Sequence, residues 1–324
     1  MTRFLLLSLL LVACAPGIPT TCAEASNPDV VDPCGTAFVG DGGTAAASGT
    51  PDPGVVPTGA VGVDGGTVDR LWFATTGDTR PLDCDQTDKY PKAAIAQIAT
   101  AMKALKVQFT VDLGDHMYVC NGSDTEAQQQ MGFYMTAIGS GPSTWFMTMG
   151  NHECGNNTYP YSCFTTAPHD ANFAAYLTAL KRPLPYYFTD VVTSQGTARF
   201  VYIADDSWNS TQASWLSSTL TESDAFKYTI IVRHHPMIGS RTGNSQILDL
   251  IRAHKYSLIL TAHNHDYEHD LASWNGRSAV VGLGGAGGLW GFATILQNAD
   301  GTLSFVRRDA NGNPVGTPWA VTPQ

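Results

Sequence analysis

The sequence has 324 residues, of which 43% are hydrophobic and only 14% are charged, so it can bury a sizeable core and is not an extended disordered chain. Its 18 Lys and Arg residues against 28 Asp and Glu residues give a net charge of −10. This charge has the wrong sign for gripping a phosphate backbone, and it excludes nucleic-acid binding through a basic surface.

The N-terminus has the pattern of an export signal. Arg3 precedes an apolar run over 4–13, which is shorter than the ~20 residues that a bilayer-spanning helix needs. The run ends in a Leu-Val-Ala-Cys string at Cys14, which resembles the lipobox of bacterial lipoproteins, where the signal is cut before the cysteine and the thiol is acylated. We predict a signal peptide over 1–13, a lipid anchor on Cys14 as the sole membrane contact, and export to the periplasmic side or the outer membrane. The alternative is an ordinary signal peptide with a nearby cleavage site.

Removing Cys14 from the seven cysteines leaves an even number in an oxidising compartment, which predicts disulfides rather than free thiols. No Cys-x-x-Cys pair supports a thiolate metal site. Two pairs are expected because their cysteines are close in the sequence, and the third pair consists of the two cysteines that remain; other connectivities stay open. The expected pairs are Cys22 with Cys34, Cys154 with Cys163, and Cys84 with Cys120.

Composition divides the chain near Gly66. The segment 14–66 is rich in Gly, Pro, Ala, Thr and Asp and has almost no periodic apolar face, which predicts a flexible tether. The remaining segment, 67–324, is of a size that one α/β catalytic domain can have.

Within that domain, apolar or β-branched runs alternate with helical spacing. The first strands are expected where short runs are bounded by Gly or polar residues, at 71–76, 107–113, 144–149, 228–232 and 256–261. The spacing of Ile95, Ile98, Met102 and Leu105 predicts a helix over 91–106. Further strands expected at 199–204, 278–281, 292–296 and 303–307 suggest a second, largely antiparallel sheet.

A polar residue that can bind a metal follows each of the first five strands. These residues are Asp78, Asp115, Asn151, His234 and His263. Open α/β sheets bind ligands at the carboxyl ends of their strands, so we expect the five side chains to converge on one crevice. Oxygen donors mixed with imidazoles suit Zn, Mn or Fe, and this combination suits a pair of ions.

The segments around these residues carry a family resemblance. They are Gly77-Asp78, Gly114-Asp115, Gly150-Asn151-His152-Glu153, His234-His235-Pro236 and His263-Asn264-His265. In order and spacing, over about 71–265, they resemble the five blocks of the calcineurin-like metallophosphoesterase superfamily. The resemblance implies an α/β fold, a four-layer αββα sandwich, and a dinuclear metal-dependent hydrolase of small phosphate esters.

Two features resemble the purple acid phosphatases in particular. Asp115 and Tyr118 match the Asp-x-x-Tyr string in which the tyrosine is a ligand of ferric iron. The superfamily usually has Asp-x-His in the first block, but this chain has Asp78-Thr79-Arg80, and a guanidinium cannot ligate a metal. Purple acid phosphatases also lack that histidine and use the tyrosinate in its place, so the resemblance implies an acid phosphatase-like phosphomonoesterase.

The resemblance implies two metal positions bridged by Asp115, filled by Fe(III) and a divalent Fe, Zn or Mn ion. Metal one would be held by Asp78, Asp115, Tyr118 and His265, and metal two by Asp115, Asn151, His234 and His263. A hydroxide shared by two cations is a nucleophile at neutral pH.

Two further residues are candidates for catalysis. His152 is expected to protonate the leaving oxygen of a phosphate monoester or to hold the phosphate. Arg80 either clamps the phosphate or merely pairs with Asp83 or Asp85.

Three other interpretations stay open. Taken singly, Asp78 and Asp115 are also compatible with turn or helix-capping roles. A Zn or Mn phosphodiesterase of the same superfamily would leave Tyr118 as a bystander. A non-catalytic metal- or phosphate-binding lipoprotein is suggested by Arg80 in place of the family's histidine.

Overall fold

A computed structural model of the protein describes residues 56–120, 124–154, 170–236, 244–270 and 274–324. The chain divides into two compact units, 1–42 and 43–324, and all described residues belong to the second. The predicted signal peptide and the cysteines Cys14, Cys22, Cys34 and Cys163 lie outside the described residues. Among the helices that are described, none has the length and apolar character needed to cross a membrane.

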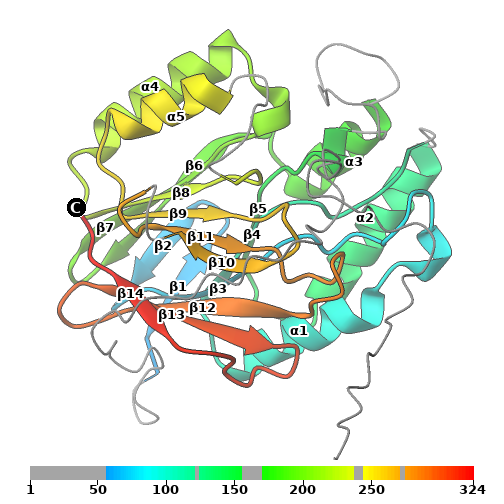
Figure 1. Ribbon diagram of the computed structural model, residues 1–324, viewed down its shortest axis with the longest axis horizontal. Helices are drawn as coiled ribbons and strands as arrows, with labels where there is room; N and C mark the ends of the chain where they lie inside the picture. Colours follow the sequence, from blue (N-terminus) through cyan, green and yellow to red (C-terminus); the bar gives the residue numbers. More distant parts are fainter. Residues whose placement is uncertain (1–55, 121–123, 155–169, 237–243, 271–273) are drawn as a thin grey trace, which may run out of the picture. The chain divides into compact units, whose positions relative to one another are not determined.

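Two β-sheets form the centre of this unit (Figure 1). The first contains, in spatial order, β1 (Gly59–Gly62), β2 (Gly65–Val68), β6 (Tyr187–Thr193), β7 (Gly196–Tyr202), β8 (Tyr228–Val232), β9 (Leu258–Thr261), β11 (Ser278–Val281) and β10 (Tyr267–Asp270). The second contains β14 (Trp319–Val321), β13 (Leu303–Asp309), β12 (Gly291–Gln297), β3 (Trp72–Thr76), β4 (Phe109–Asp112) and β5 (Trp145–Met147). Both sheets mix parallel and antiparallel pairs.

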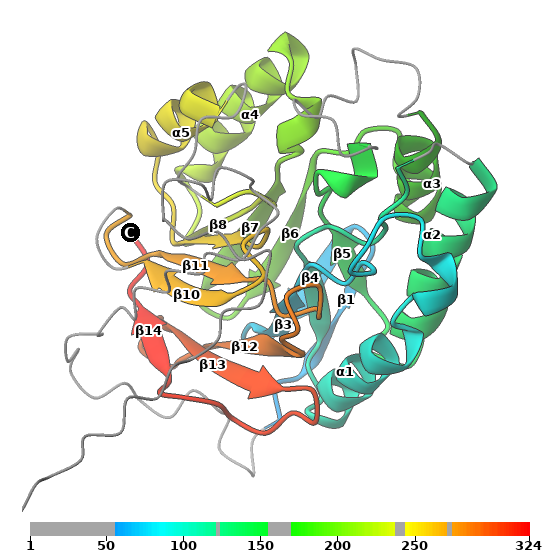
Figure 2. The ribbon, with the colours of Figure 1, turned by 45° about the vertical axis from the view of Figure 1, so that its right-hand side comes forward.

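Helices cover the outer face of each sheet (Figure 2). The helices α1 (Lys92–Ala104), α2 (Asp124–Ile138) and α3 (Asp170–Leu180) pack on the sheet that contains β3, β4 and β5. The helices α4 (Ser210–Ser223) and α5 (Asn244–Arg252) pack on the sheet that contains β7, β8 and β9. The described part of the chain is therefore a four-layer αββα sandwich, as the family resemblance implied.

The main core lies between the two sheets because alternate side chains of each strand point inward. Phe109 of β4 stacks on Phe73 of β3 with ring centroids 5.1 Å apart, and it meets Phe200 of β7 edge to face at 5.4 Å. Thr110, the next residue of β4, points to the opposite face, where its hydroxyl contacts the sulfur of Met102 on α1. Full burial of a side chain as large as Phe109 or Met102 stabilises the fold by about 1.5–3 kcal/mol.

Helix α1 confirms the helical spacing in the sequence. Ile95, Ile98 and Met102 are buried on one side of the helix. Pro91 is the residue before the helix rather than its first residue, and the chain leaves the helix through Lys106, whose φ is 57°. The helix is therefore slightly shorter than the predicted range 91–106.

The predicted arrangement of the strands needs correction. The five strands expected in one open sheet are divided, with β3, β4 and β5 in one sheet and β8 and β9 in the other. The expected second antiparallel sheet does not exist as such, because β7 and β11 join β8 and β9 while β12 and β13 join β3. Strand patterns show which residues are buried but not which strands pair, since pairing depends on contacts between distant segments.

The predicted tether also ends earlier than expected. β1 and the start of β2 fall within 14–66 and form an antiparallel hairpin. Val61 and Val68 insert into the core between the sheets, whereas the hairpin is otherwise composed mainly of Gly, Ala and Thr. Two inward valines among glycines are too weak a signal to separate a strand from a linker by composition.

Candidate metal centre

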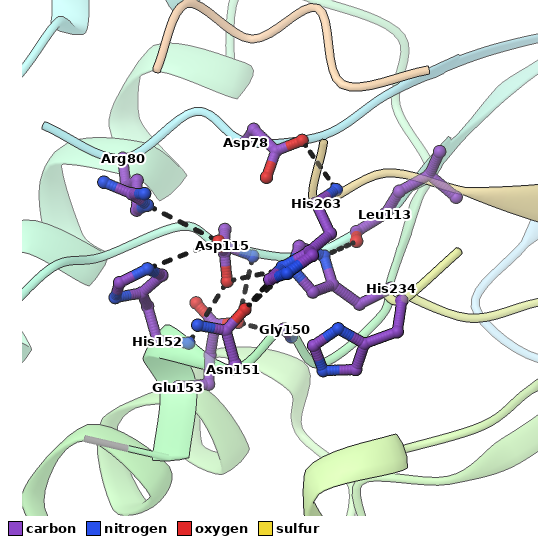
Figure 3. Close-up of polar contacts among 12 residues, drawn as sticks. Asp78, Arg80, Leu113, Asp115, Gly150, Asn151, His152, Glu153, His234 and His263 are labelled. Atoms are coloured by element: carbon purple, nitrogen blue, oxygen red, sulfur yellow. Dashed lines mark hydrogen bonds and ion pairs between the residues drawn. The ribbon is translucent and has the colours of Figure 1, made fainter. Parts of the chain in front are cut away.

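Five loops bring polar side chains together at one end of the two sheets (Figure 3). Asp78, Asp115 and Asn151 follow the parallel strands β3, β4 and β5, and His234 and His263 follow the parallel strands β8 and β9. All five are buried. The sequence placed these residues at strand ends, and the structure brings them into direct contact because the carboxyl ends of both parallel sets meet here.

The backbone at this site is held in an unusual conformation. Asp78, Asp115, His263 and His265 have φ values of 62°, 62°, 71° and 53°, in the left-handed region that residues other than glycine rarely adopt. Such strain is concentrated at functional sites, where the surrounding fold imposes it. At Gly150, a Cβ atom would lie 2.5 Å from the backbone nitrogen of Asp115, so the close approach of these two loops requires glycine.

Asn151, His234 and His263 form what we call the histidine cluster. His234 Nδ1 lies 2.7 Å from the carbonyl oxygen of Leu113, so in the neutral ring it donates to that oxygen and Nε2 keeps its lone pair. Nε2 lies 3.2 Å from His263 Nδ1, and Asn151 Oδ1 lies 3.1 Å and 3.0 Å from these two nitrogens. Asp115 Oδ1 is 3.4 Å from His234 Nε2.

These four donor atoms suit a single metal ion. Ligands at the usual 2.0–2.1 Å from one ion are roughly 3.0–3.4 Å from each other. Burial lowers the pKa of His234, but the neighbouring carboxylates of Asp115 and Asp78 raise it to about 10, so this position favours a positive charge. The donor set is the one that the resemblance assigned to metal two.

Asp78, Asp115 and His265 form a second group, which we call the carboxylate cluster. Asp78 Oδ2 accepts a hydrogen bond from the backbone of His263 at 3.0 Å, and Asp78 Oδ1 lies 3.6 Å from His265 Nε2. Within the described residues, Asp78 Oδ1 and Asp115 Oδ2 are buried oxygens without a hydrogen-bond donor. Burial raises the pKa of Asp78 to about 7. Buried carboxylate oxygens of this kind require a cation to remain charged.

Arg80 supplies positive charge to this cluster. Its guanidinium lies 3.4 Å from Asp115 Oδ2 and 3.4 Å from His265 Nε2, and the side chain is only 3% exposed. Among the described residues it pairs with Asp115, and not with Asp83 or Asp85 as one interpretation of the sequence suggested. Burial and then Arg80 lower the pKa of His265 to about 4.

Tyr118 and His152 border the carboxylate cluster. The two rings meet edge to face with centroids 4.2 Å apart, and the Arg80 guanidinium lies 4.4 Å above the Tyr118 ring. His152 Nε2 is 3.7 Å from Asp115 Oδ2, and the His152 amide donates to Asp115 Oδ1 at 3.1 Å. Burial and the nearby Arg80 charge hold the pKa of His152 well below its usual range. Ligand binding by Tyr118 and proton transfer by His152 stay predictions.

Comparison with known proteins agrees with this geometry. The family model described as calcineurin-like phosphoesterase matches residues 71–267, which contain all of the site residues above. The chain belongs to the calcineurin-like phosphoesterase family. Members of this family depend on a dinuclear metal centre, and the described residues include acidic and histidine groups able to hold a metal. No curated protein matches the chain in sequence.

Solved structures show the same fold at low identity. GAP50, the anchor in the inner membrane complex of Plasmodium, has a TM-score of 0.57 at 15% identity, covering 79% of this chain and 89% of that chain. Purple acid phosphatase PPD1 from yellow lupin (Lupinus luteus) seeds has the same TM-score, identity and coverage of this chain, with 55% of its own chain covered. A dimetal phosphatase from Danio rerio has a TM-score of 0.53 at 15% identity, covering 78% of this chain and 99% of that chain.

One important residue of this phosphoesterase site was not assigned a role from the sequence. The Glu153 carboxylate accepts hydrogen bonds from the backbone amides of Asp115 at 3.0 Å, His116 at 2.7 Å and Gly150 at 2.6 Å. It therefore holds the loops after β4 and β5 together. Its place in the Asn-His-Glu string was the available signal, but the bonds to a loop some 37 residues away are visible only in the fold.

His116 occupies a fully buried position behind the metal centre. Its Nε2 lies 2.6 Å from Asp112 Oδ1, and its Nδ1 lies 3.3 Å from Glu153 Oε1. Burial lowers the pKa of His116, but these two carboxylates raise it to about 10. The charged imidazole thereby bridges the end of β4 to the residue that holds the two loops.

A disulfide joins two of the loops that form the carboxylate cluster. Cys84, four residues after Arg80, is bonded to Cys120, two residues after Tyr118, with the Cα atoms 5.8 Å apart. This is one of the three predicted pairs. The pair Cys22–Cys34 and the partner predicted for Cys154, Cys163, lie outside the described residues.

Proposed function

We propose that the protein hydrolyses small phosphate monoesters in a metal-dependent reaction at this centre. The observation that carries the proposal is the convergence of Asn151 Oδ1, His234 Nε2 and His263 Nδ1, which lie 3.0–3.2 Å from one another, with Asp115 Oδ1 3.4 Å from His234 Nε2. Membership of the calcineurin-like phosphoesterase family supports hydrolysis of a phosphate ester.

Each part of the site has a separate role in the proposed reaction. A metal bound here lowers the pKa of a water molecule and neutralises phosphoryl oxygens. The carbonyl of Leu113 fixes the ring of His234, so that Nε2 faces the donors of the cluster. His152, beside Asp115, is placed to donate a hydrogen bond to the leaving oxygen, and its lowered pKa confines donation of a proton by the charged ring to acidic pH.

Arg80 favours a monoester over a diester. Its buried guanidinium adds a positive charge to the cluster that already contains Asp115 and His265. A phosphate monoester carries up to two negative charges near neutral pH, whereas a diester carries one. A site with an additional fixed cation therefore discriminates in favour of the monoester.

The test compares two chromogenic substrates on the full-length protein. Hydrolysis of 4-nitrophenyl phosphate and of bis(4-nitrophenyl) phosphate is measured before chelation, after chelation, and after addition of Zn²⁺, Mn²⁺ or iron. We expect faster turnover of the monoester, lost on chelation and restored by metal. Faster turnover of the diester would favour a phosphodiesterase.

A non-catalytic metal or phosphate binder is the second candidate. Arg80 stands where the superfamily usually has a metal-binding histidine, and GAP50, one of the proteins with this fold, is described as an anchor. Metal-loaded protein that binds inorganic phosphate but turns over neither substrate would support this candidate and reject the hydrolase.

We further propose export and lipid attachment through Cys14, on the signal pattern that precedes it. Expression with a radiolabelled fatty acid is expected to label the wild type and not a Cys14→Ser variant. Labelling of both proteins would reject this anchor.

A further inference from the structure

The guanidinium of Arg80 lies among the residues expected to hold metal one. It is 3.4 Å from Asp115 Oδ2, 3.4 Å from His265 Nε2 and 4.4 Å from the centroid of the Tyr118 ring. These are three of the four residues that the resemblance assigned to that metal. Figure 3 shows the side chain directed at Asp115.

Contacts with its own loop and with Tyr118 hold the Arg80 side chain in place. Its Nη1 donates to the carbonyl oxygen of Pro81 at 3.1 Å and reaches that of Leu82 at 3.5 Å. The Tyr118 ring packs against one face of the guanidinium, and the side chain is almost completely buried. An arginine held in this way has little room to leave the cluster when a cation arrives.

The Arg80 guanidinium and a metal ion cannot occupy the carboxylate cluster at the same time. A guanidinium keeps its charge in proteins and offers donors but no lone pair, so it repels a metal ion and cannot ligate one. At the same time it supplies the cation that the buried carboxylates of Asp78 and Asp115 require. The histidine cluster differs, because Asn151, His234 and His263 contribute amide and imidazole groups, which can ligate a metal, and no guanidinium.

We propose that this protein binds a single metal ion, at the histidine cluster and Asp115, and that Arg80 takes the place of the second ion as a built-in cation. The proposal rests on the proposed function for its chemistry, since the Arg80 charge would face the phosphoryl group. Arg80 Nε is the nitrogen that faces Asp115 Oδ2 at 3.4 Å, so the charge of the guanidinium lies directly beside the bridging carboxylate. The chain thus departs from the dinuclear centre of its family.

Metal stoichiometry tests the proposal without reference to activity. The full-length protein is stripped with a chelator, reloaded with excess Zn²⁺ or Mn²⁺, freed of loose metal, and measured by native mass spectrometry and elemental analysis. We expect one equivalent in the wild type. Arg80→His, which recreates the Asp-x-His string of the superfamily, is expected to bind two, while Arg80→Lys, the matched control that keeps the charge, is expected to bind one.

Two results would overturn the proposal. One is two equivalents in the wild type, and the other is a folded Arg80→His protein that still binds one. If Arg80→His does not fold, Arg80→Ala replaces it, because removal of the cation alone is expected to admit the second ion.

Loading with iron adds an independent spectroscopic readout. With Arg80 in place, we expect no tyrosinate charge-transfer band in the wild type. We expect such a band in Arg80→Ala if Tyr118 then joins Asp78, Asp115 and His265 around a ferric ion. A strong band in the wild type that is lost in Tyr118→Phe would place a ferric ion at metal one and reject the role of Arg80.

Turnover on the same samples separates this proposal from the function proposed above. One equivalent of metal without hydrolysis of 4-nitrophenyl phosphate would support Arg80 as the second cation and reject the hydrolase. Two equivalents with hydrolysis would support the hydrolase and reject the substitution by Arg80.

Discussion

The histidine cluster and the carboxylate cluster differ in what can balance the charge of their buried polar groups. The histidine cluster brings amide and imidazole atoms that can ligate a metal within 3.2 Å of each other, a spacing that one shared cation stabilises. The carboxylate cluster brings Asp78 and Asp115 together, but it already contains the guanidinium of Arg80. The first half of the centre, the histidine cluster, therefore offers ligand atoms to a metal ion, whereas the second half, the carboxylate cluster, is partly neutralised by the chain itself.

The proposed one-metal centre would result from one substitution within an unchanged fold. Asp78 and His265 both have a left-handed backbone, and Asp78 is fully buried. What changes is the residue two positions after Asp78, where arginine replaces the family's histidine.

Removing a donor from the histidine cluster is expected to have the largest effect. In Asn151→Ala, His234→Ala or His263→Ala, the loss of one donor opens the metal site, so we expect loss of metal and a fall in kcat/KM of several orders of magnitude. Metal content and hydrolysis of 4-nitrophenyl phosphate are measured together.

The matched control is His254→Ala, which removes a histidine that pairs with Asp224 before the start of β9, at the end of the strand opposite His263. We expect this variant to keep both metal and activity. Normal turnover and metal content in the cluster variants would show that catalysis does not depend on these donors, and the contrast between the two halves would disappear.

Substitution of His152 is expected to separate proton transfer from metal binding. His152 borders the carboxylate cluster, and its backbone N–H donates a hydrogen bond to the Asp115 carboxylate. We expect His152→Ala to keep its metal and to lower kcat by ~10²–10⁴-fold, as for loss of a general acid.

The companion variant His152→Asn retains a hydrogen-bond donor but cannot transfer a proton. Recovery of most of the activity in this variant would indicate that the residue holds the phosphate by hydrogen bonding. Loss of metal in His152→Ala would instead make it a residue that positions the ligands.

Glu153→Gln is expected to lower the metal affinity of the centre moderately. The substitution puts an amide N–H₂ group where one oxygen now accepts backbone hydrogen bonds from Asp115, His116 or Gly150. We expect metal affinity to fall by ~10–100-fold, as for other residues that orient ligands. The change is measured by competition with a chelating dye.

Glu222→Gln is the control, because that carboxylate pairs with Arg199 and its side chain is 65% exposed. Unchanged metal affinity in Glu153→Gln would mean that the two loops keep their geometry without this carboxylate.

The local parts of this structure were predictable from the sequence. Strand β8 is a run of buried β-branched and aromatic residues and has the predicted bounds, and α1 has the expected buried stripe. The helices α2, α3, α4 and α5 were not predicted. α2 and α4 bury polar residues such as Gln130 and Gln212 along with apolar ones, so their periodic signal is weak.

The site was predictable as a set of residues but not as an arrangement. The motifs named Asp115, Asn151, His234 and His263, and these meet in the structure. The position of Arg80 was not predictable, because its neighbours Asp115 and His265 are distant in the sequence, the latter by 185 residues. The same holds for Glu153, whose acceptor role depends on backbone amides of another loop.

The disulfide between Cys84 and Cys120 is expected to have the smallest effect on activity and a clear effect on stability. It closes a loop with a sequence separation of 36 residues. In the chain-entropy view, such a cross-link stabilises the fold by ~3–4 kcal/mol through the unfolded state. We expect the Cys84→Ser, Cys120→Ser double variant to unfold at lower denaturant concentration with an unchanged metal content.

This prediction also tests how rigid the carboxylate cluster must be. The disulfide ties the loop of Arg80 to the loop of Tyr118, while the donors of the histidine cluster lie in other loops. If Arg80 is held by its own contacts with Pro81 and Tyr118, the double variant keeps one metal ion and its preference for the monoester. If a second ion enters instead, the cross-link is what confines the guanidinium, because a released Arg80 would leave the carboxylates open to the metal.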